Sequence, residues 1–201
     1  VNLVNIGNLA KESLPVSLQE IMQNISGWVV ILLILSQSDY KEVGLFNVIL
    51  QIMMIFLFIP GVMKNVVLSY LSSCNYSIKI GMYINIFSVL LVGIFLFIFS
   101  DYVFSLYGKE VHFIASYIPL IVIICLIISV CNIYVQKMIS MRDNWRVFYS
   151  RLGRDIILYL TFILIVIFDF CNNVILAVLL AYIISNFIYL LLTRYQVKKY
   201  R

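Results

Sequence analysis

Six long hydrophobic stretches separated by short polar segments make up most of the chain. They are continuous apolar runs, not ten-residue alternations of apolar and polar residues, so the pattern favours membrane helices over the strands of a barrel. Residues 1–13 are predicted as a cytoplasmic linker and residues 194–201 as a basic cytoplasmic tail. The predicted helices cover residues 14–35, 43–63, 80–100, 113–136, 147–170 and 174–193. We therefore expect an all-α transmembrane domain of six helices.

The fifth predicted helix is the least regular of the six. Its uninterrupted apolar core, residues 156–168, is too short to cross about 30 Å of hydrocarbon at about 1.5 Å per residue. A full span has to begin near Val147, with Arg151 and Arg154 extending to the membrane surface. The pattern also allows the last two helices to form a re-entrant hairpin.

A polar stripe runs along the first predicted helix. Its residues are spaced by alternating steps of four and three, which places them on one helical face, with Gln23 beside them. The stripe comprises Ser13, Ser17, Glu20, Asn24 and Gly27. A carboxylate at membrane depth is costly, so Glu20 is expected to face a bundle interior or a wet cavity, with the other helices assembled around that face. The alternative is that Glu20 lies near the cytoplasmic interface and reaches water there.

Other polar residues lie within the apolar runs. Asn47 and Gln51 are four residues apart on the second helix, and Asn85 lies in the third. Together with the stripe they predict a polar cavity for a substrate or an ion, although hydrogen bonds between helices are the alternative for each one. We expect Glu20 to be the only acid well inside a span, since the following acids fall near loops or helix ends: Asp39, Glu42, Asp101, Glu110 and Asp169.

Composition and charge agree with a membrane protein. The chain is 64% hydrophobic and 11% charged, whereas a soluble domain is about half apolar and a quarter charged. All of its 14 lysines and arginines except Lys41 and Lys109 fall on one side of the predicted helices, which places both termini in the cytoplasm. This bias accounts for the net charge of +5 without a nucleic-acid partner. Membrane lipid is the expected surrounding.

Catalytic and metal-binding patterns are not found. The single histidine and the four cysteines lack zinc-site spacing, no phosphate-binding loop is complete, and no serine has a nucleophile-elbow context, so we expect neither an enzyme nor a cofactor. Four arginines cluster between the fourth and fifth helices: Arg142, Arg146, Arg151 and Arg154. They are typical of a cytoplasmic face, and docking of anionic lipid phosphates is the more specific hypothesis.

Two passages resemble the polysaccharide flippases of the multidrug/oligosaccharidyl-lipid/polysaccharide superfamily. Within residues 14–73, LPVSLQEIMQNISGW and VGLFNVILQIMMIFLFIPGVMKNVVLSYLSS are similar to the helix pair that opens the family's second half. Ser69 stands where the family often has proline. Residues 139–160, ISMRDNWRVFYSRLGRDIILYL, are similar to the loop entering its penultimate helix pair. Together the passages cover under half of the chain.

The resemblance implies the C-terminal half of a twelve-helix, alternating-access transporter in the bacterial inner membrane. A chain starting at Val1 without methionine agrees with a fragment, and the partner would be a missing N-terminal six-helix half. The implied substrate is an undecaprenyl-pyrophosphate-linked oligosaccharide, the O-antigen or capsule repeat unit, moved for polysaccharide biosynthesis. Family members often have cationic cavity residues, which we expect from the other half. The alternatives are a multidrug or small-solute exporter of the same superfamily, an integral-membrane glycosyl- or acyltransferase, and a non-catalytic membrane subunit.

Overall fold

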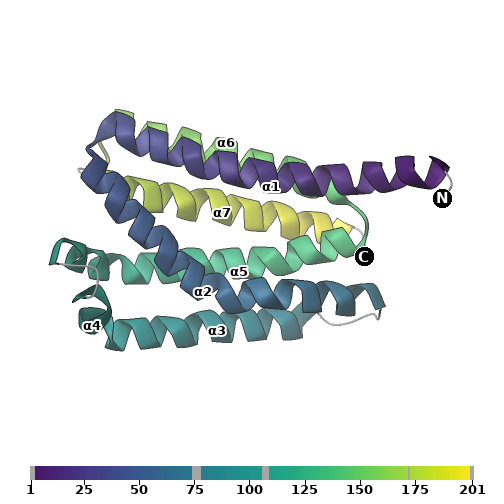
Figure 1. Ribbon diagram of the computed structural model, residues 1–201, viewed down its shortest axis with the longest axis horizontal. Coiled ribbons are helices and arrows are strands. Elements are labelled where there is room, and N and C mark those ends of the chain that lie inside the picture. The colour runs from purple at the N-terminus through teal and green to yellow at the C-terminus, as the bar shows by residue number, and fades with distance from the viewer. Residues whose placement is uncertain (1–2, 74–77, 106–108, 172, 200–201) are drawn as a thin grey trace.

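Seven α-helices and one 3-10 helix make up the part of the chain that the computed structural model describes, residues 3–73, 78–105, 109–171 and 173–199. The long helices run up and down along one axis, so that α1 begins and α7 ends at the same end of the bundle (Figure 1). The elements are α1 (Leu3–Gln37), α2 (Tyr40–Ser73), α3 (Ile78–Ile98), α4 (Ser100–Ser105), the 3-10 helix η1 (Lys109–Tyr117), α5 (Ile118–Ser140), α6 (Asn144–Ile167) and α7 (Val174–Lys199).

Five segments in the described ranges are long and apolar enough to cross a membrane. They are Ser13–Gln37, Tyr40–Ser69, Ile78–Ile98, Phe113–Ser140 and Val174–Lys199. Each overlaps a predicted helix, which confirms an all-α, multi-pass membrane bundle. The sixth span and the sidedness of the termini remain predictions.

Helix α6 corresponds to the irregular fifth predicted helix, but it starts at Asn144 and ends at Ile167. Its 24 residues measure about 36 Å at about 1.5 Å per residue, enough to cross the hydrocarbon layer. It is not among the five apolar spans because it contains more charged residues than they do. It nevertheless packs along α7 and α1, as the other long helices pack together.

Several segments predicted as linkers are helical. Helix α1 reaches back to Leu3, through most of the predicted linker, and Pro15 lies inside it. Helix α2 continues through Pro60 to Ser73, and its direction changes along its length in Figure 1. Proline lacks the N–H that would bond the carbonyl four residues earlier, a common cause of such a bend. The predicted loop after α3 forms α4 and the start of η1, and the predicted tail is helical as far as Lys199.

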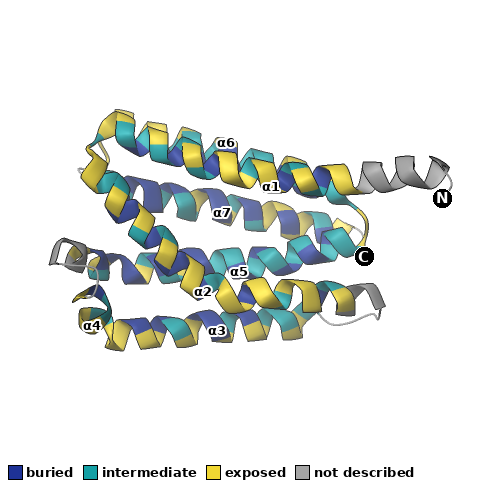
Figure 2. Ribbon diagram, in the orientation of Figure 1, coloured by how far each residue is buried: buried dark blue, intermediate teal, exposed yellow. Residues whose placement is uncertain are grey.

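Helix α7 joins two hydrophobic clusters. Ile175 and Leu179 pack with residues of α2, α3 and α5, whereas Ala177, Val178 and Ala181 pack with residues of α1, α2 and α6. In its span, 44% of the residues are buried, against 22% for α1. Figure 2 shows the same contrast between α7 and the more exposed α1. Helix α1 is therefore an edge helix, covered on one side only.

Candidate functional site

Helix α1 presents its polar stripe away from the rest of the bundle. The side that packs against the other helices contains Pro15, Gln19, Ser26, Val30 and Ile34. Ser13, Ser17, Glu20 and Asn24 are exposed, as is the neighbouring Gln23, and Gly27 is half-buried. The expectation that the other helices surround this stripe is wrong for the described residues, because α6 and α7 pack on the opposite side of α1.

A third sector of α1 is exposed and apolar. It consists of Leu14, Ile21, Ile25, Trp28 and Leu32, which are 48–68% exposed. At about 100° per residue this sector lies beside the stripe and does not overlap it. Apolar side chains suit lipid, whereas Glu20 and Asn24 at membrane depth do not. The apolar sector of α1 therefore suits lipid, and the polar stripe suits water or other polar groups.

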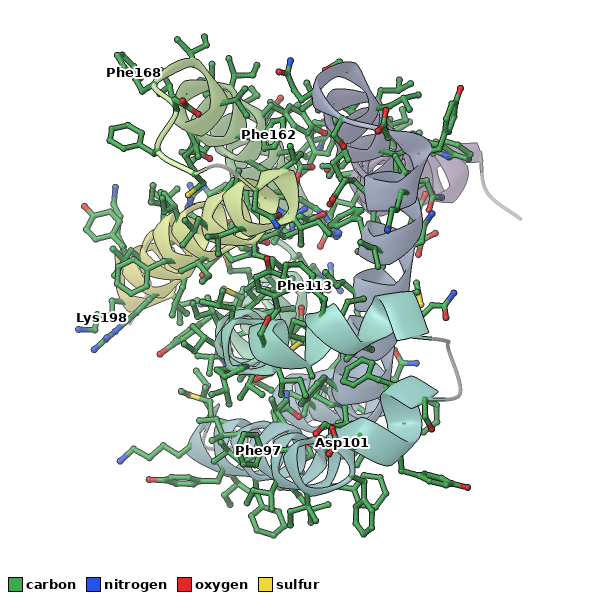
Figure 3. The ribbon with its side chains drawn as sticks, turned by 90° about the vertical axis from the view of Figure 1, so that its left-hand side faces the viewer. Phe97, Asp101, Phe113, Phe162, Phe168 and Lys198 are labelled. Carbon is green, nitrogen blue, oxygen red and sulfur yellow. The ribbon has the colours of Figure 1, made fainter. Side chains whose placement is uncertain are left out.

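Helix α2 adds two exposed amides. Asn47 and Gln51 lie on its exposed side, opposite the buried Leu45, Ile49 and Ile52. Figure 3, which looks along the bundle, shows α1 and α2 together along one flank, with α6 and α7 on the other. At about 1.5 Å per residue, Gln51 and Asn24 each lie about 17–20 Å from the turn that joins the two helices. Asn24 and Gln51 thus lie at similar distances along their helices from that turn.

Asn85 is separate from this exposed polar face. It is only 1% exposed, and its side-chain nitrogen donates a 3.3 Å hydrogen bond to the backbone oxygen of Ser129 on α5. This contact between α3 and α5 matches the helix-packing alternative that the sequence left open.

The four clustered arginines separate into two pairs. Arg142 and Arg146 are exposed at the turn between α5 and α6, where Arg146 Nη1 lies 3.1 Å from Asp143 Oδ2. Arg151 and Arg154 lie further along α6 and are largely covered by neighbouring helices. The expectation that this second pair extends to the surface is wrong, because both residues lie on the packed side of α6.

Arg154 forms an ion pair inside the bundle. Its Nε donates a 2.9 Å hydrogen bond to Asp155 Oδ1, and its Nη2 donates to the same oxygen. The side chains are 18% and 1% exposed, respectively. The guanidinium also stands 5.7 Å from the ring centre of Tyr189 on α7, within range of a cation–π contact. Asp155 Oδ2 and Arg151 Nε make no hydrogen bond to the described residues.

Further polar contacts tie α6 to its neighbours around this ion pair. Gln196 Nε2 of α7 donates a 3.0 Å hydrogen bond to Ser150 Oγ, and Tyr159 of α6 lies close to Ser26 of α1. Buried charges in proteins need such partners, since an uncompensated charge costs several kcal/mol. The helices α1, α6 and α7 therefore enclose a polar centre with charges of both signs.

Sequence reasoning missed this polar centre although a signal was present. Asp155 falls in helical register with Val147, Leu158, Phe162 and Ile165, all buried on the packed face of α6. Figure 3 shows Phe162 on the side of α6 that faces the bundle and Phe168 outside it. The register places Asp155 inside, so Glu20 is not the only acid within a helix of the bundle.

The described residues contain no group of three His, Cys, Asp or Glu side chains placed to hold a metal ion. The candidate site thus consists of an exposed polar face on α1 and α2 and a buried ion pair behind it. Comparison of the chain with known protein families, curated proteins and solved structures gives no match. Fold and composition establish a multi-pass helical membrane protein.

Proposed function

We propose that this chain is half of an alternating-access flippase that moves an undecaprenyl-pyrophosphate-linked oligosaccharide across the bacterial inner membrane. The observation that carries the proposal is the exposed polar sector of α1, which stands beside a lipid-suited sector on the same helix. A charged side chain costs about 2.5–3.5 kcal/mol on insertion scales at the centre of a membrane helix and less toward its ends, and Glu20 lies about 10 Å inside the Ser13–Gln37 span. A second helical unit that leaves a wet cavity against α1 and α2 removes that cost.

The chemistry of the exposed face suits a sugar. Gln23, Asn24, Asn47 and Gln51 offer amide donors and acceptors, and Glu20 adds an acceptor with charge. Such groups hydrogen-bond hydroxyls, while the lipid tail of the substrate remains in the bilayer beside the apolar sector of α1. The sequence resemblance to polysaccharide flippases supports the same substrate class. An ion gradient supplies the energy in this proposal.

The proposal is tested in the source bacterium by deleting the gene and restoring variants at matched expression. Deletion should abolish surface polysaccharide and leave the lipid-linked oligosaccharide in the inner leaflet. The Glu20→Gln variant should restore transport only weakly, since it removes the charge from the cavity wall. Asp39→Asn is the matched control, because Asp39 is an exposed acid at the turn between α1 and α2.

One outcome would remove Glu20 from the mechanism, and two would contradict the flippase itself. Full polysaccharide with Glu20→Gln would remove Glu20 from the mechanism. Intact polysaccharide with altered drug sensitivity in the deletion strain would indicate a multidrug exporter instead. Formation of a glycosylated or acylated product from a labelled donor by the purified protein would indicate an enzyme.

A further inference from the structure

A pocket of about 280 Å³ opens at the end of the bundle where α5 meets α6. Its polar wall comprises Arg142, Asp143, Arg146 and Gln196, and its apolar wall comprises Met138, Met141 and Val197. Among the described lining residues, two guanidinium groups and one carboxylate give a net positive charge. We propose that this pocket binds the phosphate headgroup of an anionic membrane lipid through Arg142 and Arg146, a site independent of the transport function proposed above.

The turn at Arg142 has a backbone conformation that is unfavourable for any residue except glycine. The N–H of Asp143 bonds the oxygen of Met138 at 3.1 Å, and the N–H of Arg142 bonds the oxygen of Ile139 at 2.9 Å. These two bonds define a Schellman helix end, in which the residue at the position of Arg142 adopts a left-handed backbone and is usually glycine. Arg142 has φ of 60°. A bulky residue at a position that usually holds glycine is a reason to look for a role of its side chain.

The position of the pocket at the level of interfacial aromatic residues suits a lipid headgroup. Trp145 and Tyr149 stack at a ring-centre distance of 5.9 Å at the start of α6, and they are 40% and 62% exposed. Exposed tryptophan and tyrosine at helix ends are typical of the membrane–water interface. Basic pockets between helix ends at this level bind anionic headgroups.

The apolar wall favours a lipid over free phosphate. Met141 is 39% exposed and lines the pocket together with the buried Met138 and Val197, so these residues form an apolar floor beside the arginines. A glycerol backbone and the first carbons of an acyl chain would cover that floor, whereas an inorganic ion would not. Arginine pairs also suit the oxygens of a phosphate because they present several N–H donors in a fixed plane.

Tryptophan quenching tests the site directly. The chain has two tryptophans, and Trp28→Phe leaves Trp145 as the single reporter beside the pocket. The full chain is reconstituted in phosphatidylcholine with a small fraction of bromine-labelled phosphatidylglycerol or bromine-labelled phosphatidylcholine. We expect the anionic lipid to occupy the site about fivefold or more in preference to the zwitterionic lipid. Equal quenching by both lipids would overturn the proposal.

Matched variants separate the pocket from general surface charge. Arg142→Gln with Arg146→Gln should remove the preference, whereas Lys198→Gln with Lys199→Gln removes the same charge from exposed residues of the same bundle end and should keep it. An equal loss in both double variants would indicate unspecific attraction and refute the site. Displacement of the labelled lipid by excess inorganic phosphate would refute lipid as the ligand.

Arg142→Gly provides the folding control. Glycine accepts the left-handed backbone without strain, so this variant should keep or raise the thermal midpoint while it lowers the preference for phosphatidylglycerol. A fall in the midpoint that accompanies the loss of preference would assign Arg142 a structural role instead.

Discussion

The Arg154–Asp155 pair allows a sharp test of how charge is held inside the bundle. Arg154→Met leaves the carboxylate of Asp155 buried without its main partner, and Asp155→Leu leaves two guanidinium groups without a carboxylate. Removing one member of a buried ion pair costs about 3–5 kcal/mol, while replacing both members by apolar residues is often neutral. With exposures of 18% and 1%, the pair belongs to the buried class.

The structure predicts an order among these variants. Arg151 lies close enough to interact electrostatically with both Arg154 and Asp155, and its Nε has no hydrogen-bond partner among the described residues. In Arg154→Met, Arg151 can therefore replace part of the lost contact to Asp155. In Asp155→Leu no carboxylate remains in the cluster, so this variant should be the least stable. The double variant should regain at least about 2 kcal/mol relative to Asp155→Leu.

The assay is reversible unfolding in mixed micelles of increasing denaturing-detergent fraction, followed by the loss of helical circular dichroism. Arg146→Gln is the matched control, because its pair with Asp143 is exposed by 47% and 26% and should be worth less than about 1 kcal/mol. Losses below about 1 kcal/mol in both single variants, or strictly additive losses in the double variant, would refute a buried, coupled pair.

Variants at three further positions test the packing of the helices and the role of Asn85. In detergent unfolding, Asn173→Ala should destabilise the protein by about 1 kcal/mol, whereas Asn173→Ser should not. The reason is that Asn173 Oδ1 accepts hydrogen bonds from the N–H groups of Ile175 and Leu176 at 2.9 and 3.3 Å, and a serine hydroxyl can also accept them. Gly93→Leu should cost about 1–3 kcal/mol and Gly93→Ala less, since a Cβ there lies 3.2 Å from Val122 Cγ2, and equal stability of both variants would contradict close packing of α3 on α5. Asn85→Leu should leave polysaccharide export unchanged, because Asn85 is buried between helices. Loss of export at normal expression would indicate that Asn85 belongs to the transport site.

The sequence predicted the helices better than their ends or their faces. Apolar run length located the five segments that meet the criteria for a span, because the hydrophobic thickness of a membrane fixes that length. Helix ends were misplaced because polar residues at the membrane edge remain helical, as in α2 beyond Met63 and in α7 beyond Thr193. Apolar composition marks where the hydrocarbon layer ends, but it does not show that a helix continues beyond that boundary.

The candidate site was only partly predictable for a different reason. Helical spacing found the stripe of Glu20 and Asn24, but it could not show that the neighbouring helices pack on the other side of α1. The charge of Arg154 suggested the surface, whereas its burial depends on the adjacent Asp155 and on Tyr189 from a distant helix. A single-sequence pattern carries no information about such partners.

Accessibility of α1 to a membrane-impermeant thiol reagent is the most direct test of the central claim that its polar stripe lines a wet cavity. Single cysteines replace Asn24 and Ile25 in a protein whose own cysteines are changed to serine or alanine. Asn24 lies in the middle of the Ser13–Gln37 span, too deep for contact with water at the interface. We predict labelling at Asn24→Cys and none at Ile25→Cys in intact membranes. Equal protection of both positions would contradict the cavity and the transport function built on it.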